Sequence, residues 1–249
     1  MKIKDATFII SVASADKFYK TNKPIIAVAG KSNVGKSSLI NMLANKKKLA
    51  KTSVTPGRTR LINYFDFGEF VLADLPGYGF AKVSKDEKKK WAKLLESFLA
   101  NEKISLLLSL VDIRHDPTED DKMMVTYLYH YAVPFSLIAT KADKLGKTKI
   151  KPRLQEIATD LKVGVGDITA SSAETGLGKE KILSIIDQAI SVKNVVDDEE
   201  QEEIEKSNYI YTIDDKGINL IKYNGEYTAL IDIPDIYCKN TLYAEKRIR

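Results

Sequence analysis

GKSNVGKS, at residues 30–37, decides the fold of this chain because it fits the pattern G-x-x-x-x-G-K-[ST]. An apolar run at 24–29 precedes it and predicts a buried strand, and a helical pattern at 36–44 follows it. A glycine-rich turn between a strand and a helix lets backbone N–H groups and the helix N-terminus face an anion. The stretch therefore predicts a phosphate-binding loop, formed by Gly30, Lys31, Ser32, Asn33, Val34, Gly35, Lys36 and Ser37.

Two side chains of this loop are expected to act directly on a bound nucleoside triphosphate. The Lys36 ammonium would reach the β- and γ-phosphates, and the Ser37 hydroxyl would ligate Mg²⁺. Lys36 is therefore a candidate catalytic residue and Ser37 a candidate metal ligand.

The chain outside this loop alternates between apolar runs and helical patterns as far as about residue 192. Strands are expected at 24–29, 61–67, 70–73, 104–111, 134–139 and 165–169, and helices at 36–44, 84–99, 119–131, 150–161 and 178–190. Such alternation predicts an α/β fold with a mostly parallel sheet flanked by helices on both faces.

A second phosphate-facing segment follows the strand predicted at 70–73. Its sequence, Asp74-Leu75-Pro76-Gly77, fits the pattern D-x-x-G. In GTP-dependent switch proteins the Asp at this strand end holds Mg²⁺ through a water, and the Gly N–H contacts the γ-phosphate. We therefore expect Gly77 to take part in catalysis and to sense the state of the nucleotide.

The segment between these motifs lies where a switch loop is expected. Residues Gly57, Arg58, Thr59, Arg60 and Leu61 are candidates for nucleotide contact. One threonine should complete the magnesium shell, and both Thr55 and Thr59 are available. We prefer Thr59, as a catalytic residue and metal ligand, because it directly precedes the strand that starts at Leu61.

A base-recognition loop is predicted after the strand at 134–139. Its residues Thr140, Lys141, Ala142 and Asp143 resemble the pattern N-K-x-D, with Thr in place of Asn. The Asp143 carboxylate can accept two hydrogen bonds from guanine, whereas adenine lacks both donors. Ala170, Ser171 and Ser172 follow the last predicted strand, and a backbone N–H of Ser172 or Ala173 would support the guanine O6.

The composition changes near residue 195. Residues 195–249 hold 7 basic and 13 acidic residues, a net −6, whereas residues 1–194 hold 32 and 21, a net +11. We expect a P-loop domain at 1–194, an acidic linker at 195–206 and a small β-rich appendage at 207–249. The positive charge of the first domain favours a polyanionic partner such as RNA, although solvated surface lysines would give the same count.

Several classes of protein are disfavoured by composition. The chain has one cysteine, Cys238, and two histidines, which provide neither a disulfide nor a zinc cluster. No apolar run approaches 18 residues, so no membrane helix is expected. Residues 1–20 are expected to form an edge strand or a leader packed on the core rather than a signal peptide, because Asp5 and Asp16 interrupt them. These features indicate a cytoplasmic protein.

Taken together, these strings resemble the EngB (YihA/YsxC) family of ribosome-biogenesis GTP-binding proteins, within the Era/EngA/TrmE-like group. The resemblance covers roughly residues 1–192. The strings that carry it are GKSNVGKSSLIN (30–41), TPGRTRLINYF (55–65), DLPGYGFAKVS (74–84), VDIRHDPTEDD (111–121), TKADKL (140–145) and ASS (170–172).

The resemblance implies a GTPase that binds GTP or GDP with Mg²⁺ and acts on the large ribosomal subunit, as a monomer and away from membranes. Tyr78 stands where Ras-type enzymes have a water-positioning glutamine, so slow intrinsic hydrolysis is expected. In related GTPases an Asn at the position of Asn33 can help bind K⁺ beside the phosphates, although a loop-stabilising role is an equal alternative.

Two other functions share these motifs. One is an Era-like GTPase that serves the small subunit or tRNA modification, which the strings after Asp74 and Val111 disfavour. The other is a module that holds GTP with negligible turnover, which Tyr78 keeps open.

Overall fold

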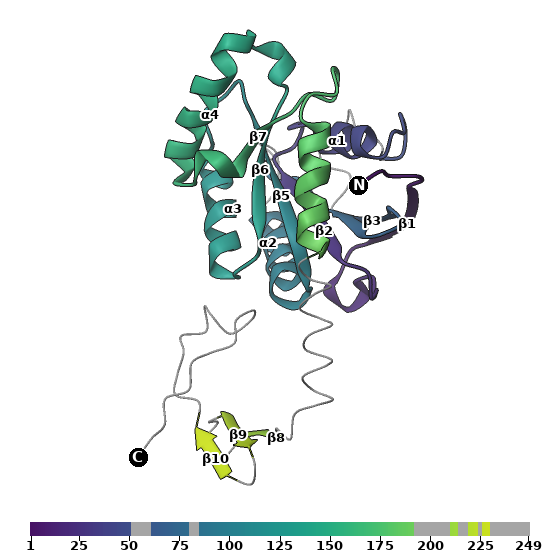
Figure 1. The fold of residues 1–249 in the computed structure, drawn as a ribbon, viewed down its shortest axis with the longest axis vertical. Coiled ribbons are helices and arrows are strands. Elements are labelled where there is room, and N and C mark those ends of the chain that lie inside the picture. Colours follow the sequence, from purple (N-terminus) through teal and green to yellow (C-terminus); the bar gives the residue numbers. More distant parts are fainter. Residues whose placement is uncertain (51–60, 80–84, 192–209, 214–218, 224–225, 230–249) are drawn as a thin grey trace. The chain divides into compact units, whose positions relative to one another are not determined.

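The computed structural model describes residues 1–50, 61–79, 85–191, 210–213, 219–223 and 226–229, with the side chains of 85–88 and of 210–229 left undescribed. The chain divides into two compact units, Met1–Ile190 and Ser191–Arg249 (Figure 1).

A seven-stranded sheet, in the order β1-β3-β4-β2-β5-β6-β7, forms the centre of the first unit. Its strands are β1 (Thr7–Val12), β2 (Ile25–Gly30), β3 (Ile62–Asp66), β4 (Val71–Asp74), β5 (Ile104–Asp112), β6 (Phe135–Thr140) and β7 (Ile168–Ala170). From β4 to β7 every pairing is parallel, whereas β1, β3 and β4 pair antiparallel. The mostly parallel α/β sheet predicted from the sequence is confirmed.

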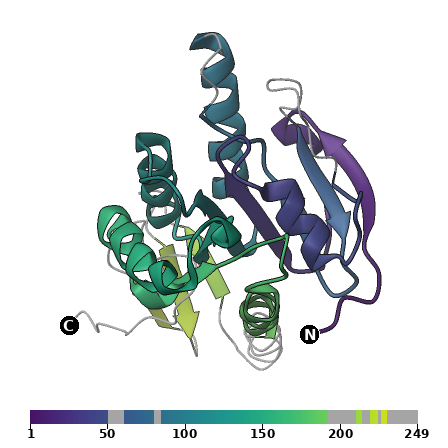
Figure 2. The ribbon, with the colours of Figure 1, turned by 90° about the horizontal axis from the view of Figure 1, so that it is seen from above.

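Helices cover both faces of this sheet, as Figure 2 shows. The helices are α1 (Lys36–Leu43), α2 (Lys85–Asn101), α3 (Glu119–His130), α4 (Lys147–Leu161) and a helix at 179–191. Alternate residues of β2 point to opposite faces. Ile26 and Val28 pack with α1 and the helix at 179–191, while Ile25 and Ala27 pack with α2 and α3. A third apolar cluster joins α4 to β6 and β7. Burial on both faces explains why β2 has a continuous apolar sequence.

Two elements start three residues away from their expected positions, and at the N-terminus one of the two expected alternatives is observed. Residues expected to begin the last strand form a 3₁₀ turn, Val165–Asp167, closed by the Asp167 amide on the Gly164 carbonyl at 3.0 Å. Helix α4 begins at Lys147, whereas the sequence predicted a start at Ile150. The first residues of the helix are exposed and carry no apolar periodicity, so the sequence pattern did not reveal them. At the N-terminus, the alternative of an edge strand is the one observed, since β1 pairs with β3.

The second unit contains three short antiparallel strands in the order β10-β9-β8. They are β8 (Ile210–Ile213), β9 (Asn219–Tyr223) and β10 (Glu226–Ala229). Residues 224–225, between β9 and β10, lie outside the described residues.

None of the helices in the described ranges is both long and apolar enough to cross a membrane.

Candidate nucleotide-binding site

The phosphate loop joins the end of β2 to the start of α1. Gly35, which precedes α1, has φ +117°, a backbone angle that residues with a Cβ rarely adopt. No side chain caps α1 from this position, so its first-turn amides are available to an anion. The loop reverses direction through a hydrogen bond from the Val34 amide to the Lys31 carbonyl at 3.1 Å, with Asn33 in the left-handed region.

Lys36 and Asp74 face each other across this loop. The Lys36 Nζ lies 3.8 Å from Asp74 Oδ1, and the two side chains are only 14% and 12% exposed. Burial raises the pKa of Asp74, and the Lys36 ammonium opposes that shift. Asp74 Oδ1 is buried and accepts no hydrogen bond within the described part of the chain. A buried carboxylate oxygen without a donor is costly, which indicates a ligand-binding position.

These residues fit a magnesium ion. Mg²⁺ keeps several waters and is usually held by one or two protein oxygens together with substrate phosphates. The unpartnered Asp74 oxygen would accept from a metal-bound water, and Ser37 sits next to Lys36 in the first turn of α1. No cluster of three or more His, Cys, Asp or Glu able to hold a metal occurs in the described ranges, as expected where phosphate oxygens supply the remaining ligands.

The D-x-x-G segment lies directly on the phosphate loop. The Leu75 amide donates to the Val28 carbonyl at 2.9 Å, which extends the β4 pairing by one residue. A Cβ at Gly77 would lie 3.0 Å from Ser32 Oγ and 3.2 Å from Lys36 Nζ. A side chain at Gly77 would require Ser32 or Lys36 to shift by a few tenths of an ångström, so the Gly77 backbone lies close to the lysine expected to hold the γ-phosphate.

Lys141 connects the base loop to the phosphate loop. Its ammonium donates to the Asn33 carbonyl at 2.7 Å and to Asp112 Oδ2 at 2.9 Å. Asp112, at the end of β5, also accepts two hydrogen bonds from the Arg114 guanidinium, at 2.8 and 2.9 Å. Burial alone would raise the pKa of Asp112, but the bonds from Arg114 and Lys141 outweigh it and hold that pKa far below its usual value. The ionised carboxylate fixes the Lys141 stem along the expected base position.

Asp143 is oriented by a neighbouring hydroxyl. The Ser172 Oγ donates to Asp143 Oδ1 at 2.7 Å, and Lys144 pairs with Oδ2 at 2.9 Å. The bond from Ser172 and the Lys144 charge lower the pKa of Asp143, so the carboxylate is ionised and an acceptor at neutral pH. The Ser172 amide donates to the Leu177 carbonyl at 3.1 Å, which favours Ala173 as the amide for the guanine O6.

The remaining residues of these two loops form their framework. Thr140, Ala142 and Ser171 are buried, and Ala170 is partly buried. The Ala142 amide donates to the Ser171 carbonyl at 3.0 Å, and the Ser171 amide donates to the Ala139 carbonyl at 2.8 Å. The two loops that follow β6 and β7 are thus brought together, as the sequence predicted.

Thr140, which replaces the commoner Asn, has a structural role that its sequence position did not reveal. Its side-chain oxygen lies 2.7 Å from the Val34 carbonyl and 3.0 Å from the Val111 carbonyl. A hydroxyl has one proton, so it can donate a hydrogen bond to only one of these two carbonyls at a time. Thr140 therefore ties the phosphate loop to β5.

We expect Thr140→Val to weaken GDP binding by about five- to tenfold and to lower the free energy of unfolding by about 1–3 kcal/mol, because two buried carbonyls lose their donor. Isothermal titration and urea unfolding measure the two effects. Thr140→Ser keeps the hydroxyl, so its GDP affinity should stay within about twofold of the parent value. Equal losses of GDP affinity in the two variants would contradict this role.

Four candidates of the switch loop, Gly57, Arg58, Thr59 and Arg60, lie outside the described residues, as does Thr55. Leu61 is described and directly precedes β3. The choice of Thr59 as magnesium ligand stays a prediction.

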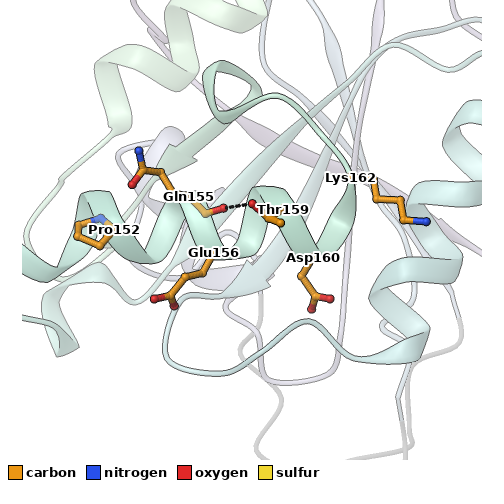
Figure 3. Close-up of a pocket in the computed structure, with 6 residues that line it drawn as sticks. All are labelled: Pro152, Gln155, Glu156, Thr159, Asp160 and Lys162. Carbon is orange, nitrogen blue, oxygen red and sulfur yellow. Dashed lines mark hydrogen bonds between the residues drawn. The ribbon is translucent and has the colours of Figure 1, made fainter.

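A surface hollow lies on α4, away from these loops (Figure 3). It is lined by Pro152, Gln155, Glu156, Thr159, Asp160 and Lys162. Asp160 also pairs with Lys122 of α3 at 3.3 Å. None of the residues predicted to bind the nucleotide contributes to this hollow.

Known proteins are similar to this chain in sequence and in fold. A family model described as "50S ribosome-binding GTPase" matches residues 25–141. The "Probable GTP-binding protein EngB" of Bacillus cereus strain B4264 is 44% identical over 197 residues, which are 78% of this chain and 100% of that protein. The chain belongs to the EngB family of GTP-binding proteins. It is therefore a GTPase, as its sequence predicted.

Further similarities agree with membership of the EngB family. The protein of the same name from Desulfosudis oleivorans is 44% identical over 188 residues, 75% of this chain and 95% of that protein. The crystal structure of a probable GTP-binding protein engB superposes with a TM-score of 0.57 at 23% identity, covering 67% of this chain and 98% of that chain. Aquifex aeolicus Era bound to GDP and AlF4⁻ gives 0.55 at 21% identity, covering 68% and 57%. These two structures show a shared fold.

Proposed function

We propose that this protein binds GTP and GDP with Mg²⁺ and acts as a slow GTPase switch in the assembly of the large ribosomal subunit. The observation that carries the switch is the close approach of the Gly77 backbone to the phosphate loop, where a Cβ on Gly77 would lie 3.0 Å from Ser32 Oγ and 3.2 Å from Lys36 Nζ. The ribosomal role is supported by the family's description and by the net +11 of residues 1–194.

The hydrolytic chemistry would be shared among residues on three elements. Lys36 would neutralise the β- and γ-phosphates, Gly77 would donate to the γ-phosphate, and Ser37 with Asp74 would hold Mg²⁺, Asp74 through a water. When bound, the metal ion stabilises charge that develops on the phosphate oxygens. Thr59 would complete its ligand set in the GTP state.

Base selection would rest on the Asp143 carboxylate. Its orientation by Ser172 places acceptor oxygens for the two guanine donors, and the Lys144 ammonium would move aside on binding. An adenine base offers neither of these donors to the Asp143 carboxylate, so we expect ATP to compete poorly.

Intrinsic turnover would be slow because Tyr78, the residue that follows D-x-x-G, is a poor substitute for an amide that orients water. The Tyr78 side chain is only 4% exposed and its hydroxyl is bonded to Asp121, so it faces the interior. A monovalent cation beside Asn33 would supply part of the missing charge. Asn33 is exposed, with a φ of +63° that Asn tolerates better than most residues, so a loop-stabilising role also fits.

We expect GTP hydrolysis at equal ionic strength to be at least several-fold faster in KCl than in NaCl, because K⁺ would add positive charge next to the transferring phosphate. Phosphate release under single-turnover conditions measures this. Equal rates in the two salts would assign Asn33 to the loop conformation alone.

Sedimentation with purified ribosomal subunits tests the proposed partner. Co-migration with the 50S subunit in the presence of a non-hydrolysable GTP analogue, and less of it with GDP, is the expected result. Co-migration with the 30S subunit alone would favour an Era-like role and overturn the proposal. Co-migration with neither, together with negligible turnover, would indicate a GTP-holding module.

We further propose a domain organisation of 1–194, 195–206 and 207–249, in a monomeric cytoplasmic protein. It is supported by the full coverage of a relative by 78% of this chain, which leaves the rest without a counterpart there. Removing residues 195–249 should leave GDP affinity unchanged. If the appendage contacts the ribosome, 50S binding falls; if it is a flap on the first domain, the melting temperature falls instead.

A further inference from the structure

The backbone of Tyr78, the residue after the D-x-x-G segment, is hydrogen-bonded to the phosphate loop. Its carbonyl accepts a hydrogen bond from the Ser32 amide at 2.9 Å, and Tyr78 and Lys31 form a parallel bridge. Since Gly77 precedes it, any displacement of Tyr78 moves the amide that is expected to contact the γ-phosphate. The position of Tyr78 therefore sets the geometry at the nucleotide.

The side chain of Tyr78 is hydrogen-bonded to α3. Its hydroxyl donates to Asp121 Oδ1 at 2.9 Å, and both side chains are buried. Burial and the neighbouring Asp121 carboxylate raise the pKa of Tyr78 well above its usual value, so the phenol stays a neutral donor. A buried carboxylate requires donors, and the Tyr78 hydroxyl is a donor to Oδ1.

The other oxygen of Asp121 caps α3. Asp121 Oδ2 accepts from the Thr118 amide at 2.8 Å and from the Thr118 hydroxyl at 2.7 Å. Thr118 is the N-cap residue of α3. One carboxylate thus joins the helix cap to Tyr78, 43 residues away in the sequence.

Trp91 of α2 contacts the segment from Pro76 to Tyr78 as well. Its indole Nε1 donates to the Pro76 carbonyl at 3.0 Å, and its ring meets the Tyr78 ring edge-on with centroids 5.9 Å apart. The segment from Pro76 to Tyr78 is consequently held by α2, α3 and the phosphate loop together. A segment held at three points transmits a displacement at one of them to the others.

We propose that Tyr78 and Asp121 form a latch that positions Gly77 for the γ-phosphate and couples the nucleotide state to the N-terminus of α3. The latch rests on the proposed role of Gly77 in reading GTP, but not on any ribosomal role. Tyr78 is a positioning residue: its side chain points away from the nucleotide and acts through the Gly77 backbone.

The test compares affinities for GDP and for a non-hydrolysable GTP analogue in the full-length protein. Tyr78→Phe removes one hydroxyl and keeps the packing against Trp91. We expect it to weaken binding of the analogue by about five- to tenfold, the equivalent of one buried hydrogen bond, and to leave GDP affinity within about twofold. A purely structural role would lower the melting temperature and change both affinities by the same factor.

Thr118→Val is the matched control, because it removes a hydroxyl from the same carboxylate but leaves the bond to Tyr78. It should lower the melting temperature while preserving the ratio of the two affinities. In the double variant with Tyr78→Phe, that ratio should equal the value of Tyr78→Phe alone. A ratio changed by Thr118→Val as much as by Tyr78→Phe would overturn the latch.

Amide hydrogen exchange at residues 119–122 tests the coupling itself. Protection there should be greater with the GTP analogue than with GDP in the parent protein, and the difference should vanish in Tyr78→Phe. A difference that persists in the variant overturns the coupling, even if GTP hydrolysis and 50S binding are as proposed. Conversely, loss of 50S binding alone would count against the proposed partner and leave the latch intact.

Discussion

Replacing Asp143 by Asn is expected to convert the base preference of the site from guanine to xanthine. Asn offers one acceptor and one donor, which match the N1–H and the 2-oxo group of xanthine, whereas guanine presents two donors. Each charge-assisted bond to Asp143 contributes about 1.5–3 kcal/mol, so GDP affinity should fall by about 100-fold or more. Competition titrations with GDP, XDP and ADP against a fluorescent nucleotide measure the preference.

Ser172→Ala is the control for this change. It removes the hydroxyl that orients Asp143 at 2.7 Å but keeps the carboxylate, so guanine should remain preferred with a loss of about fivefold. If Asp143→Asn lowered affinity for all three purine nucleotides alike, the carboxylate would have no part in reading the base.

Removing the ammonium of Lys36 is expected to have the second large effect. Lys36→Ala should reduce affinity for GTP in the presence of Mg²⁺ by about 100-fold or more, because it removes a poorly exposed cation next to two phosphates. The variant also leaves the Asp74 carboxylate without the cation that faces it, so a lower melting temperature is expected. Calorimetric titration and thermal unfolding measure the two effects.

Lys23→Ala is a matched control for Lys36→Ala, because it also breaks a Lys–Asp pair. Lys23 pairs with Asp66 at 2.9 Å, with both side chains about 40% exposed and away from the phosphate loop. GTP affinity should stay unchanged in this variant. A comparable loss in both would mean that net charge, rather than contact with phosphate, governs binding.

The sequence predicted most of the fold because its signals are local. The alternation of apolar strands and amphipathic helices identified nearly every element, and each loop motif follows its own strand. The last strand was placed too early because Val165 has a side chain that favours a strand, whereas residues 165–167 form a 3₁₀ turn. Exposed lysines likewise hid the first turn of α4.

The contacts that complete the site were not predictable because they join distant residues. Lys141 reaches a carbonyl 108 positions away, at Asn33, and Thr140 reaches Val34 over 106 positions. These pairings depend on β2, β5 and β6 lying side by side, which a linear pattern does not specify. Asp121 had only a Thr-x-x-Asp capping signal, which indicates a helix start and says nothing of Tyr78.

The bridge that Lys141 makes between Asn33 and Asp112 has a consequence for the protein without nucleotide. The loops that hold the phosphates and the base are already joined by the hydrogen bond from Lys141 to the Asn33 carbonyl, and Asp112 holds Lys141 in place, so a ligand has little ordering cost to meet on arrival. Release, by the same reasoning, requires no collapse of these loops. We therefore expect nucleotide exchange to proceed without a large rearrangement of these two loops.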